Sequence, residues 1–396
     1  MSTDLVEFRQ RAREWLAANA PAGGTGPGSV AEARAFMAKL YDAGFSGISW
    51  PAEWGGQGLG QAEQRVFDEE AGAYTLPTYY FSIGLGMCGP TVVDLGTDEQ
   101  RRRWVRRLLR GEDIWCQLFS EPNAGSDVAA LQTRAERAGD GWVVNGQKVW
   151  TSVAQHADLG LLLARTDVDA PKHKGLTMFV IDMHAPGVTV RPLKDMSGRS
   201  NFNEIFFDDV HVPDENRIGE VNDGWRCAVT TLLHERLSIS GGVGGVAGGR
   251  GNPASFEALR ATCDTADPVV RDALVELYVR ERALELFNAR LGQETRAGIF
   301  PGARGSAGKL LLAELTQFRA DLATSLAGPA AVAWDPETEG AGGLAEALSV
   351  APGLALGGGT NEIMRNIIGD RVLNLPPEPR ADKNVPFKDL KVGTQQ

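Results

Sequence analysis

The sequence predicts an α+β protein with helices first, strands in the middle and helices again at the end. Residues 1–110 are rich in Ala and Leu and are punctuated by Gly and Pro, as expected of helices joined by short loops. From Trp115 to about Val212, short β-branched and aromatic runs are separated by turn residues. The helical period returns at Trp225. Because helices and strands occupy separate blocks, this order disfavours an alternating β-α-β sheet.

The first block carries one clear helix start and one basic run. Thr97 and Gln100 have the spacing of a capping box, in which each side chain bonds the other residue's backbone N–H. The run from Arg101 to Arg107 follows, with acidic residues on both sides. Proteins that bind a phosphate backbone need a basic surface, whereas this chain has a net charge of −11 and an isoelectric point near 5.1. We therefore expect a solvated helix face and no nucleic-acid partner.

The middle block contains turn pairs that are typical of β-hairpins. Asp140-Gly141 and Asn145-Gly146 both belong to the residue pairs that favour tight turns between strands. Nearby, Trp142–Val144 and Thr177–Ile181 consist mainly of residues that favour strands. The middle of the chain is therefore predicted to be a β domain.

The last block is predicted to consist of long helices. Breaks that contain Gly, Pro or Asp separate helical segments at roughly 225–248, 268–293 and 304–327. We accordingly predict three domains: an N-terminal helical domain at 1–112, a central β domain at 113–222 and a C-terminal helical domain at 223–396.

Two glycine-rich stretches look like nucleotide-binding motifs, but their contexts argue against that function. Gly84–Gly89 matches G-x-G-x-x-G, and the preceding Tyr79–Ile83 could form the strand that this motif requires. However, Pro90 follows at once and the surroundings are helical, so we do not expect a dinucleotide site. Gly241–Gly249 follows a helical segment, where small residues would let a helix or a flat ligand approach the backbone closely.

Composition places the chain among ordinary soluble proteins of two or three domains. Its 396 residues are 43% hydrophobic and 23% charged. The four cysteines are far apart and lack C-x-x-C spacing, so neither disulfides nor a metal site is expected and a reducing compartment fits. No apolar run of about 18 residues occurs, and the N-terminal stretch lacks the apolar segment of a signal peptide. We predict a cytoplasmic protein without a membrane span.

Two stretches carry a resemblance to the acyl-CoA dehydrogenase family. Phe119–Asp127 resembles the signature that joins the family's first helical domain to its β domain, and Asn145–Ser152 resembles a second signature beside the flavin. Shorter similar stretches are Trp54–Gly56, Phe202–Glu204 and Gly358–Ile363. The resemblance implies a helical domain, a β barrel-like domain and a C-terminal four-helix domain. It also implies FAD-dependent introduction of an α,β double bond into an acyl-CoA thioester.

The resemblance assigns a cofactor role to residues of both signatures. A flavin that takes up hydride at N5 develops negative charge near N1 and C2=O, where hydrogen-bond donors stabilise it. By resemblance, Phe119 and Ser120 lie on that side, Trp150 stacks on the ring and Ser152 bonds N5, with Thr151 between them. The C-terminal stretch adds Thr360 and Glu362 as cofactor-binding residues. A turn cluster and a core tryptophan would be the structural alternative.

The catalytic base departs from the commonest pattern of the family. Many members carry a glutamate directly before a Gly-Thr pair, but here that position is Gly358. A smaller branch, which includes isovaleryl-CoA dehydrogenase, has its glutamate on an earlier helix before an arginine, and Glu235-Arg236 stands there. The resemblance thus implies Glu235 as the base and Arg236 as its organiser. A salt bridge to another element, or plain solvent exposure, is the structural alternative for Glu235.

The same resemblance assigns the acyl-CoA thioester to three positions. Ser126 would contact the CoA portion, although a serine in a Gly-Ser-Asp turn can also cap a helix. Gly358 would offer its N–H to the thioester oxygen, with Gly359 beside it. Expected partners are an electron-transferring flavoprotein and further subunits, as a homodimer, a homotetramer or a hetero-oligomer.

Two other functions stay open at the level of sequence. Arg250–Pro253 stands where the family usually has an Arg-x-x-Phe-Gly stretch that helps a neighbouring subunit hold FAD, and Ala341–Gly343 is an uncertain match to the adenine end. These gaps allow a non-catalytic partner subunit of a mixed oligomer. A flavin oxidase or monooxygenase on the same fold is the other alternative.

Overall fold

The computed structural model describes residues 3–21, 28–241, 252, 254–297, 299, 301–332, 343–379 and 382–390. The chain divides into two compact units. Unit 1 comprises Met1–Asp195, Ser200–His234 and Pro379–Gln396, and unit 2 comprises Met196–Arg199 and Glu235–Glu378. The two units are described separately, and the predicted three-domain boundaries at 112 and 222 stay a prediction.

Unit 1 begins with the predicted helices. These are α1 (Thr3–Asn19), α2 (Val30–Asp42), α3 (Gln61–Ala71), α4 (Gly89–Leu95) and α5 (Asp98–Leu109). The capping box at the start of α5 is confirmed, because Thr97 Oγ1 accepts from the Gln100 N–H and Gln100 Oε1 accepts from the Thr97 N–H. Its arginines lie on the exposed face in ion pairs such as Arg103–Glu215, while Trp104 is buried. The solvated helix face is thus confirmed.

The G-x-G-x-x-G stretch is helical rather than the turn after a strand. Tyr79–Phe81 is a short 3-10 turn, so the possible strand there is wrong, and Gly84–Cys88 forms a π-helical turn that runs into α4. A Cβ at Gly84 or Gly89 would come within 2.5 or 2.3 Å of Leu108. These glycines therefore serve close helix packing.

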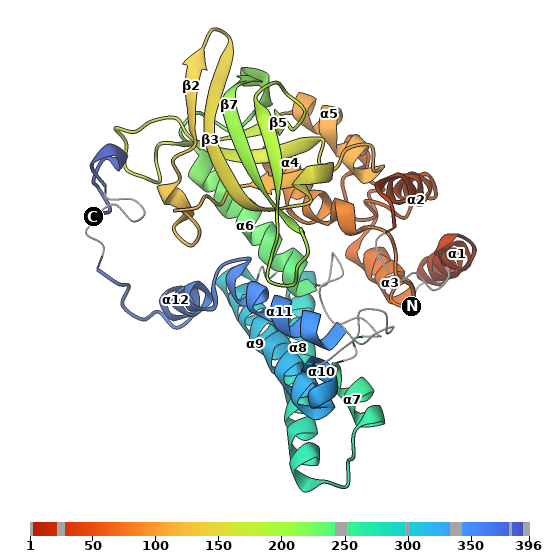
Figure 1. Ribbon diagram of the computed structural model, residues 1–396. Coiled ribbons are helices and arrows are strands. Elements are labelled where there is room, and N and C mark those ends of the chain that lie inside the picture. Colours follow the sequence, from red (N-terminus) through yellow and green to blue (C-terminus); the bar gives the residue numbers. More distant parts are fainter. Residues whose placement is uncertain are drawn as a thin grey trace. The chain divides into compact units, whose positions relative to one another are not determined.

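The central strands of unit 1 form one curved sheet (Figure 1). They are β1 (Trp115–Leu118), β2 (Arg134–Ala138), β3 (Gly141–Ser152), β4 (Leu159–Arg165), β5 (Leu176–Asp182), β6 (Val188–Leu193), β7 (Phe202–Pro213) and β8 (Arg217–Ile218). The order is β6-β7-β3-β2-β4-β5-β8, with β1 beside β4. β1 pairs parallel to β4. The long antiparallel pair of β3 and β7 positions the second signature stretch.

One of the two predicted hairpins is wrong. β2 and β3 form a hairpin that closes at Ala138 and Gly141, which confirms the first turn pair. Asn145-Gly146, by contrast, lies inside β3 at a bulge opposite β7. Gly146 has φ 150°, and a Cβ there would come within 2.5 Å of Thr133 Oγ1. The glycine permits a close approach of backbone to a neighbouring side chain, and β3 continues through it to Ser152.

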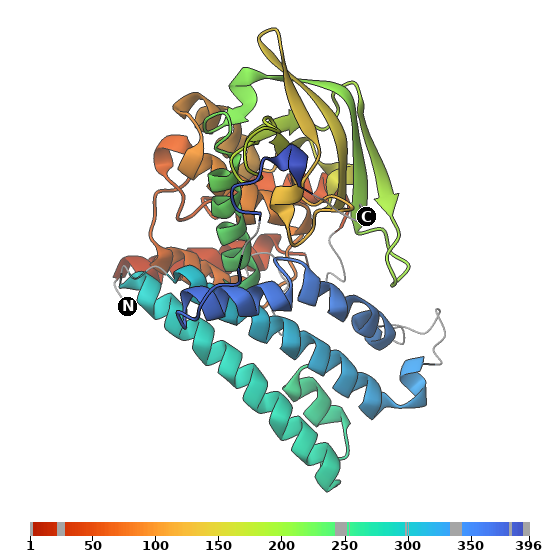
Figure 2. The same ribbon diagram turned by 90° about the vertical axis from the view of Figure 1, so that its left-hand side faces the viewer.

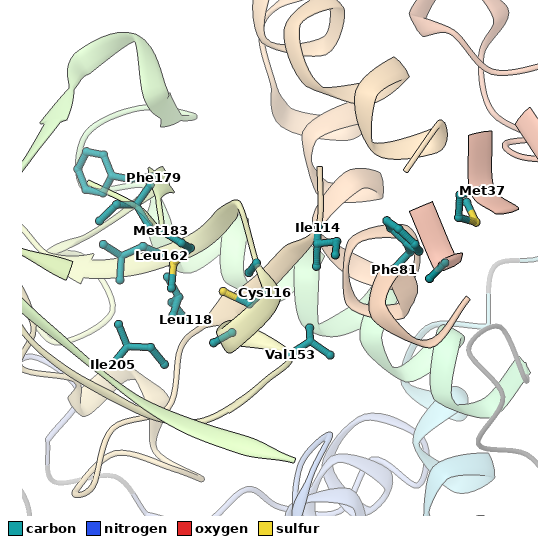
Figure 3. Close-up of a cluster of buried hydrophobic side chains, with 14 of the residues drawn as sticks. Met37, Phe81, Ile114, Cys116, Leu118, Val153, Leu162, Phe179, Met183 and Ile205 are labelled. Atoms are coloured by element: carbon teal, nitrogen blue, oxygen red, sulfur yellow. The ribbon is translucent and has the colours of Figure 1, made fainter. Parts of the chain in front are cut away.

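A continuous hydrophobic core joins the helices of unit 1 to its sheet (Figure 3). Met37 and Phe81 contribute from the helical part, Cys116 from β1, and Phe179 and Ile205 from the sheet. Each is at most 1% exposed. The first strand is therefore anchored between helices and sheet, which fixes the chain that follows it.

Asp214 provides a testable electrostatic anchor at the end of β7. Its carboxylate accepts from Trp142 Nε1 at 2.7 Å and from Arg217 Nε at 3.1 Å, with Arg137 Nη1 at 3.0 Å. These partners, Arg217 first, lower the pKa of Asp214 to about 2. Such a shift, discounted for partial solvent screening, corresponds to about 1–2 kcal/mol of stability.

The stabilisation by Asp214 should depend on pH in one direction. Because the pKa is depressed in the folded state, the stabilisation is present above the unfolded pKa of about 3.9 and is lost as pH falls toward 2. We expect Asp214→Asn to lower the free energy of unfolding by about 1–2 kcal/mol at pH 7 and by less at pH 3. Urea unfolding of both proteins at the two pH values measures this. An equal loss at both would contradict the assignment.

Unit 2 is helical. Its helices are α7 (Phe256–Thr262), α8 (Pro268–Arg296), α9 (Gly305–Ala327), α10 (Pro329–Val332), α11 (Gly343–Leu356) and α12 (Asn361–Arg371). α6 (Gly224–Gly241) belongs to unit 1 as far as His234 and to unit 2 from Glu235. α9 contacts α8, α11 and α12, and α8 and α9 run side by side (Figure 2). These helices confirm the helical C-terminal block.

Three stretches that the sequence singled out belong to this unit. Gly242–Gly249 of the glycine-rich run, most of Arg250–Pro253, and Ala341-Gly342 fall outside the described residues. In the described ranges, no helix combines the length and apolar character needed to cross a membrane.

Candidate functional site

The two signature stretches lie side by side in unit 1. Phe119 and Ser120 directly follow β1, and the Val149 N–H in β3 donates to the Ser120 carbonyl at 2.9 Å. The Phe119 side chain is 4% exposed, whereas Ser120 is half-buried. Thus the structure brings together the stretches that the sequence singled out separately.

A buried lysine holds the first signature in place. Lys148 Nζ donates to the Phe119 carbonyl at 3.0 Å and to Glu121 Oε1 at 2.8 Å. Glu121 also accepts from the N–H groups of Gln132 and Thr133, at 2.6 and 2.9 Å. Burial alone would raise the pKa of Glu121, but the Lys148 charge and these hydrogen bonds lower it below its ordinary value. The loop that carries Phe119 is therefore fixed by an internal ion pair.

Trp150 is displayed by a strained backbone. β3 is bulged between Lys148 and Thr151, where Trp150 has φ 60°, an uncommon value for a bulky residue that costs about 1–3 kcal/mol. Its side chain is 57% exposed and meets Phe202 edge-on at 5.8 Å between ring centroids. Asn203 Nδ2 donates to the Thr151 carbonyl at 3.0 Å and secures the bulge. The strain turns a large aromatic face away from the core, as a ligand-stacking residue requires.

The polar groups around this tryptophan fit a flavin ring. The hydroxyls of Ser120 and Ser152 have no hydrogen-bond partner among the described residues. Thr151 Oγ1 is buried and is likewise without a partner within those ranges. Isoalloxazine offers a flat face for stacking and N and O acceptors along its edge. The residues present therefore suit FAD, with Trp150 available to the ring and both serines available to its acceptors.

A polar cavity is lined by residues of both signatures. It has a volume of about 450 Å³ and is lined by Glu121, Asn123, Arg134, Asn145 and Gln147 among others. Ser126, in the same signature, is exposed and caps no helix, since the short 3-10 turn after it has Asp127 at its N-cap and no side-chain cap bond. Its hydroxyl thus has no structural task in capping.

Unit 2 holds the second group of predicted residues around a glycine turn. Gly358 and Gly359 have φ 71° and 89°, and a Cβ at Gly359 would come within 2.5 Å of Met364 Cε. Thr360 follows as the N-cap of α12, with its Oγ1 accepting from the Ile363 N–H at 3.2 Å. The turn needs glycine at both positions because the left-handed region strains other residues. A carboxylate-bearing residue at 358 would be strained as well.

Glu362 lies in the first turn of α12 and is exposed. Its own backbone N–H and the Thr360 side chain lower the pKa of the Glu362 carboxyl. Both residues therefore have a clear role in starting the helix, in keeping with the preference for acidic groups at a helix N-terminus. Their predicted role in cofactor binding stays a prediction.

Glu235 and Arg236 lie next to each other on α6, and both are half-buried. Burial lowers the pKa of Arg236, which Glu235 opposes and Arg371 reinforces. In unit 1, the preceding residue His234 bonds Asp94 Oδ2 through Nε2 at 2.8 Å. This partner accounts for His234 as a structural residue.

Sequence reasoning missed a buried lysine near Glu235. Lys309 on α9 is 0% exposed, and its Nζ donates to the Gly359 carbonyl at 2.5 Å. The missed signal was a single lysine inside the small and apolar segment Gly308–Ala313. Lys148, which lies within the second signature, is a second such residue, because a lysine at an inward-facing strand position indicates a buried partner.

Together, the fold and the site define a flavoprotein oxidoreductase built from a helical, a β-sheet and a second helical domain. Models of the acyl-CoA dehydrogenase N-terminal, middle and C-terminal domains match residues 2–112, 116–210 and 222–373. The chain therefore belongs to the acyl-CoA dehydrogenase family, whose members are FAD-dependent flavoproteins. The family membership that the two signatures predicted is confirmed, and so is FAD as the cofactor.

Two mycobacterial relatives show how far the similarity extends. Acyl-CoA dehydrogenase FadE34 of Mycobacterium tuberculosis is 42% identical over 85% of this chain, which spans only 45% of the length of FadE34. Acyl-CoA dehydrogenase IpdE1 of the same organism is 37% identical over 96% of this chain and 100% of its own length. The second match covers both chains almost end to end.

Two solved structures share the fold throughout. The Tcur3481-Tcur3483 steroid ACAD has a TM-score of 0.80 at 30% identity and covers 96% of this chain and 99% of that chain. The ChsE4-ChsE5 complex from Mycobacterium tuberculosis has a TM-score of 0.77 at 31% identity, with the same coverage.

Proposed function

We propose that this acyl-CoA dehydrogenase uses Glu235 to remove the α-proton of an acyl-CoA thioester as the α,β double bond forms. The observation that supports this choice is the structure of the C-terminal turn. Gly358 occupies the place where many relatives carry the base, and its φ of 71° disfavours any residue with a carboxylate. The family pattern offers one other position for the base, and Glu235 stands there. Glu235 is half-buried beside Arg236 and lies close to the buried Lys309.

The reaction requires two groups that the chain can supply. An α-proton becomes acidic enough when the thioester carbonyl is polarised by fixed donors, and a carboxylate in a dry pocket is a strong enough base to take it. Gly358 supplies the backbone N–H for the oxygen of the thioester carbonyl, and Gly359 allows the left-handed turn beside it. Arg236 orients the carboxylate of Glu235. Ser126 contacts the CoA portion. FAD, when bound, accepts the hydride from the β-carbon.

The flavin residues follow from unit 1. When FAD is bound, Trp150 would stack on the ring, Ser152 would donate to N5, and Phe119 and Ser120 would line the side on which negative charge develops. Thr151 supports the bulge between them. The family resemblance assigns Thr360 and Glu362, at the start of α12, to the cofactor as well. The exposed indole supports these roles, and so do the two serine hydroxyls, which have no hydrogen-bond partner among the described residues.

The substrate is proposed to be a bulky, steroid-derived acyl-CoA. Support comes from the similarity to a steroid ACAD over nearly the whole chain. A proposal about assembly follows from the structure of the ChsE4-ChsE5 complex, because ChsE4 and ChsE5 bind each other there. We propose that this chain works as a homo-oligomer or with a related second subunit, in the cytoplasm, and passes electrons to an electron-transferring flavoprotein.

The substrate proposal is tested by anaerobic mixing of the purified yellow protein with short, branched and steroid-like acyl-CoAs. We expect a steroid-like thioester to bleach the flavin band fastest and to yield the enoyl-CoA. Equal or better reduction by a short straight chain would contradict the steroid assignment. A colourless chain that gains activity only with a second subunit would favour the non-catalytic partner. Rapid oxygen consumption by the reduced protein would favour an oxidase.

A further inference from the structure

Lys309 is a fully buried ammonium whose hydrogen bonding is incomplete. Its side chain is 0% exposed, and among the described residues the Gly359 carbonyl is its only hydrogen-bond acceptor. An ammonium has three N–H donors, and an ionised group removed from water is costly unless charges and hydrogen bonds compensate. A structural lysine that merely filled space would be replaceable by methionine at lower cost. The charge therefore indicates a function at this position.

Two charged groups on other helices, α6 and α12, act on Lys309. Burial lowers the pKa of Lys309, while Glu235 on α6 and Glu362 on α12 raise it. The charge of Glu235 raises the pKa of Arg236 on the same helix, and the charge of Arg371 at the end of α12 lowers it. Among these groups Glu362 is exposed and starts a helix, so Glu235 is the half-buried carboxylate that the Lys309 charge can influence most.

Lys309 also fixes the glycine turn. Gly358 and Gly359 both adopt left-handed φ values, and such a turn has no side chains of its own to hold it. The Lys309 bond to the Gly359 carbonyl ties the turn to α9, one of the longest helices of unit 2. One ammonium thus links the proposed base and the proposed carbonyl-binding turn.

We propose that Lys309 is a positioning residue of the reaction: its hydrogen bond holds the Gly358–Gly359 turn, and its ammonium places a positive charge near the carboxylate of Glu235. This inference rests on the proposed role of Glu235. Neutral Glu235 cannot accept the α-proton, so the charge extends activity to lower pH. No proton leaves Lys309 in this scheme, because its ammonium acts through its field and its hydrogen bond alone.

The first test is the pH dependence of kcat/KM in the FAD-loaded enzyme. Lys309→Met should move the acidic limb upward by about one pH unit, because a nearby positive charge lowers a carboxylate pKa by about that much or more. Lys309→Arg retains the charge and should restore the wild-type limb. A methionine variant that holds FAD and keeps the wild-type limb would overturn the proposal. If that variant does not fold, Lys309→Gln gives the same comparison.

The second test needs no activity. In thermal unfolding, Lys309→Met should lower Tm less in the Glu235→Gln background than in the wild type, with a departure from additivity of about 2 °C or more. Lys148→Met combined with Glu235→Gln is the control, because Lys148 is equally buried but pairs with Glu121 in unit 1. The Tm changes caused by Lys148→Met and by Glu235→Gln should therefore add. Additive Tm changes for Lys309 as well would overturn the proposal.

The two proposals can fail separately. If Glu235→Gln keeps wild-type turnover, the base assignment is wrong regardless of Lys309. If Glu235→Gln is inactive while Lys309→Met shows an unshifted limb and additive Tm changes, only the inference about Lys309 fails.

Discussion

Glu235→Gln is expected to lower the rate of flavin reduction by the best acyl-CoA by about 10²–10⁴-fold, the usual contribution of a general base. Glutamine has nearly the same shape but cannot accept the α-proton. Because glutamine keeps the size of the side chain and no flavin contact is assigned to Glu235, the variant should still purify with bound FAD. Stopped-flow absorbance of the flavin band measures the rate, and the spectrum before mixing measures the FAD content.

A matched control tests whether the loss of activity is specific to Glu235 or would follow from removing any carboxylate of unit 2. Glu257→Gln removes an exposed carboxylate that pairs with Arg260 in α7, also in unit 2, and should leave the rate unchanged. Turnover close to wild type in Glu235→Gln would exclude the residue as the base. Loss of FAD from that variant would instead assign Glu235 a part in binding the cofactor.

The second large effect is expected at Lys148, which should matter for stability and for FAD together. Lys148→Met leaves Glu121, 7% exposed, with two backbone N–H donors and without its ion-pair partner, so that only the more distant charge of Arg165 remains. Breaking one half of a buried ion pair costs about 3–5 kcal/mol. The loss also frees the Phe119 carbonyl and so loosens the first signature. Urea unfolding and the FAD content of the purified variant measure both effects.

The double variant Lys148→Met/Glu121→Gln distinguishes charge from shape. It removes both charges, so no buried carboxylate is left unpaired, and most of the lost stability should return. FAD content should recover less, because the bond to the Phe119 carbonyl is still absent. A Lys148→Met protein with wild-type stability and a full complement of FAD would contradict the role assigned to this ion pair.

The sequence predicted the fold and the two signature stretches because both depend on local patterns. Blocks of helical and strand periodicity gave the α+β order, and Thr97 and Gln100 marked the start of α5 correctly. The Asn145-Gly146 pair was misleading, since the same residues that favour a tight turn also permit a bulge. Only the pairing of β3 with β7 decides between the two, and that pairing is a long-range property.

The buried charges could not be predicted in the same way. Lys148 and Glu121 are 27 residues apart, and Lys309 reaches a carbonyl 50 residues away. Nothing in local spacing identifies such partners; the only sequence signal is a lysine inside an apolar segment. The exposed face of Trp150 was equally hidden, because its display depends on a positive φ at the bulge.

The most direct test of the proposed reaction is a single anaerobic turnover with a steroid-like acyl-CoA that carries deuterium at the β-carbon. If the chain is a dehydrogenase in which the β-hydride reduces the flavin, bleaching should be slower than with the unlabelled thioester, and the product should be an enoyl-CoA that has lost one β-deuterium. Bleaching without an isotope effect and without enoyl product, or no bleaching by any thioester of a fully FAD-loaded protein, would contradict it.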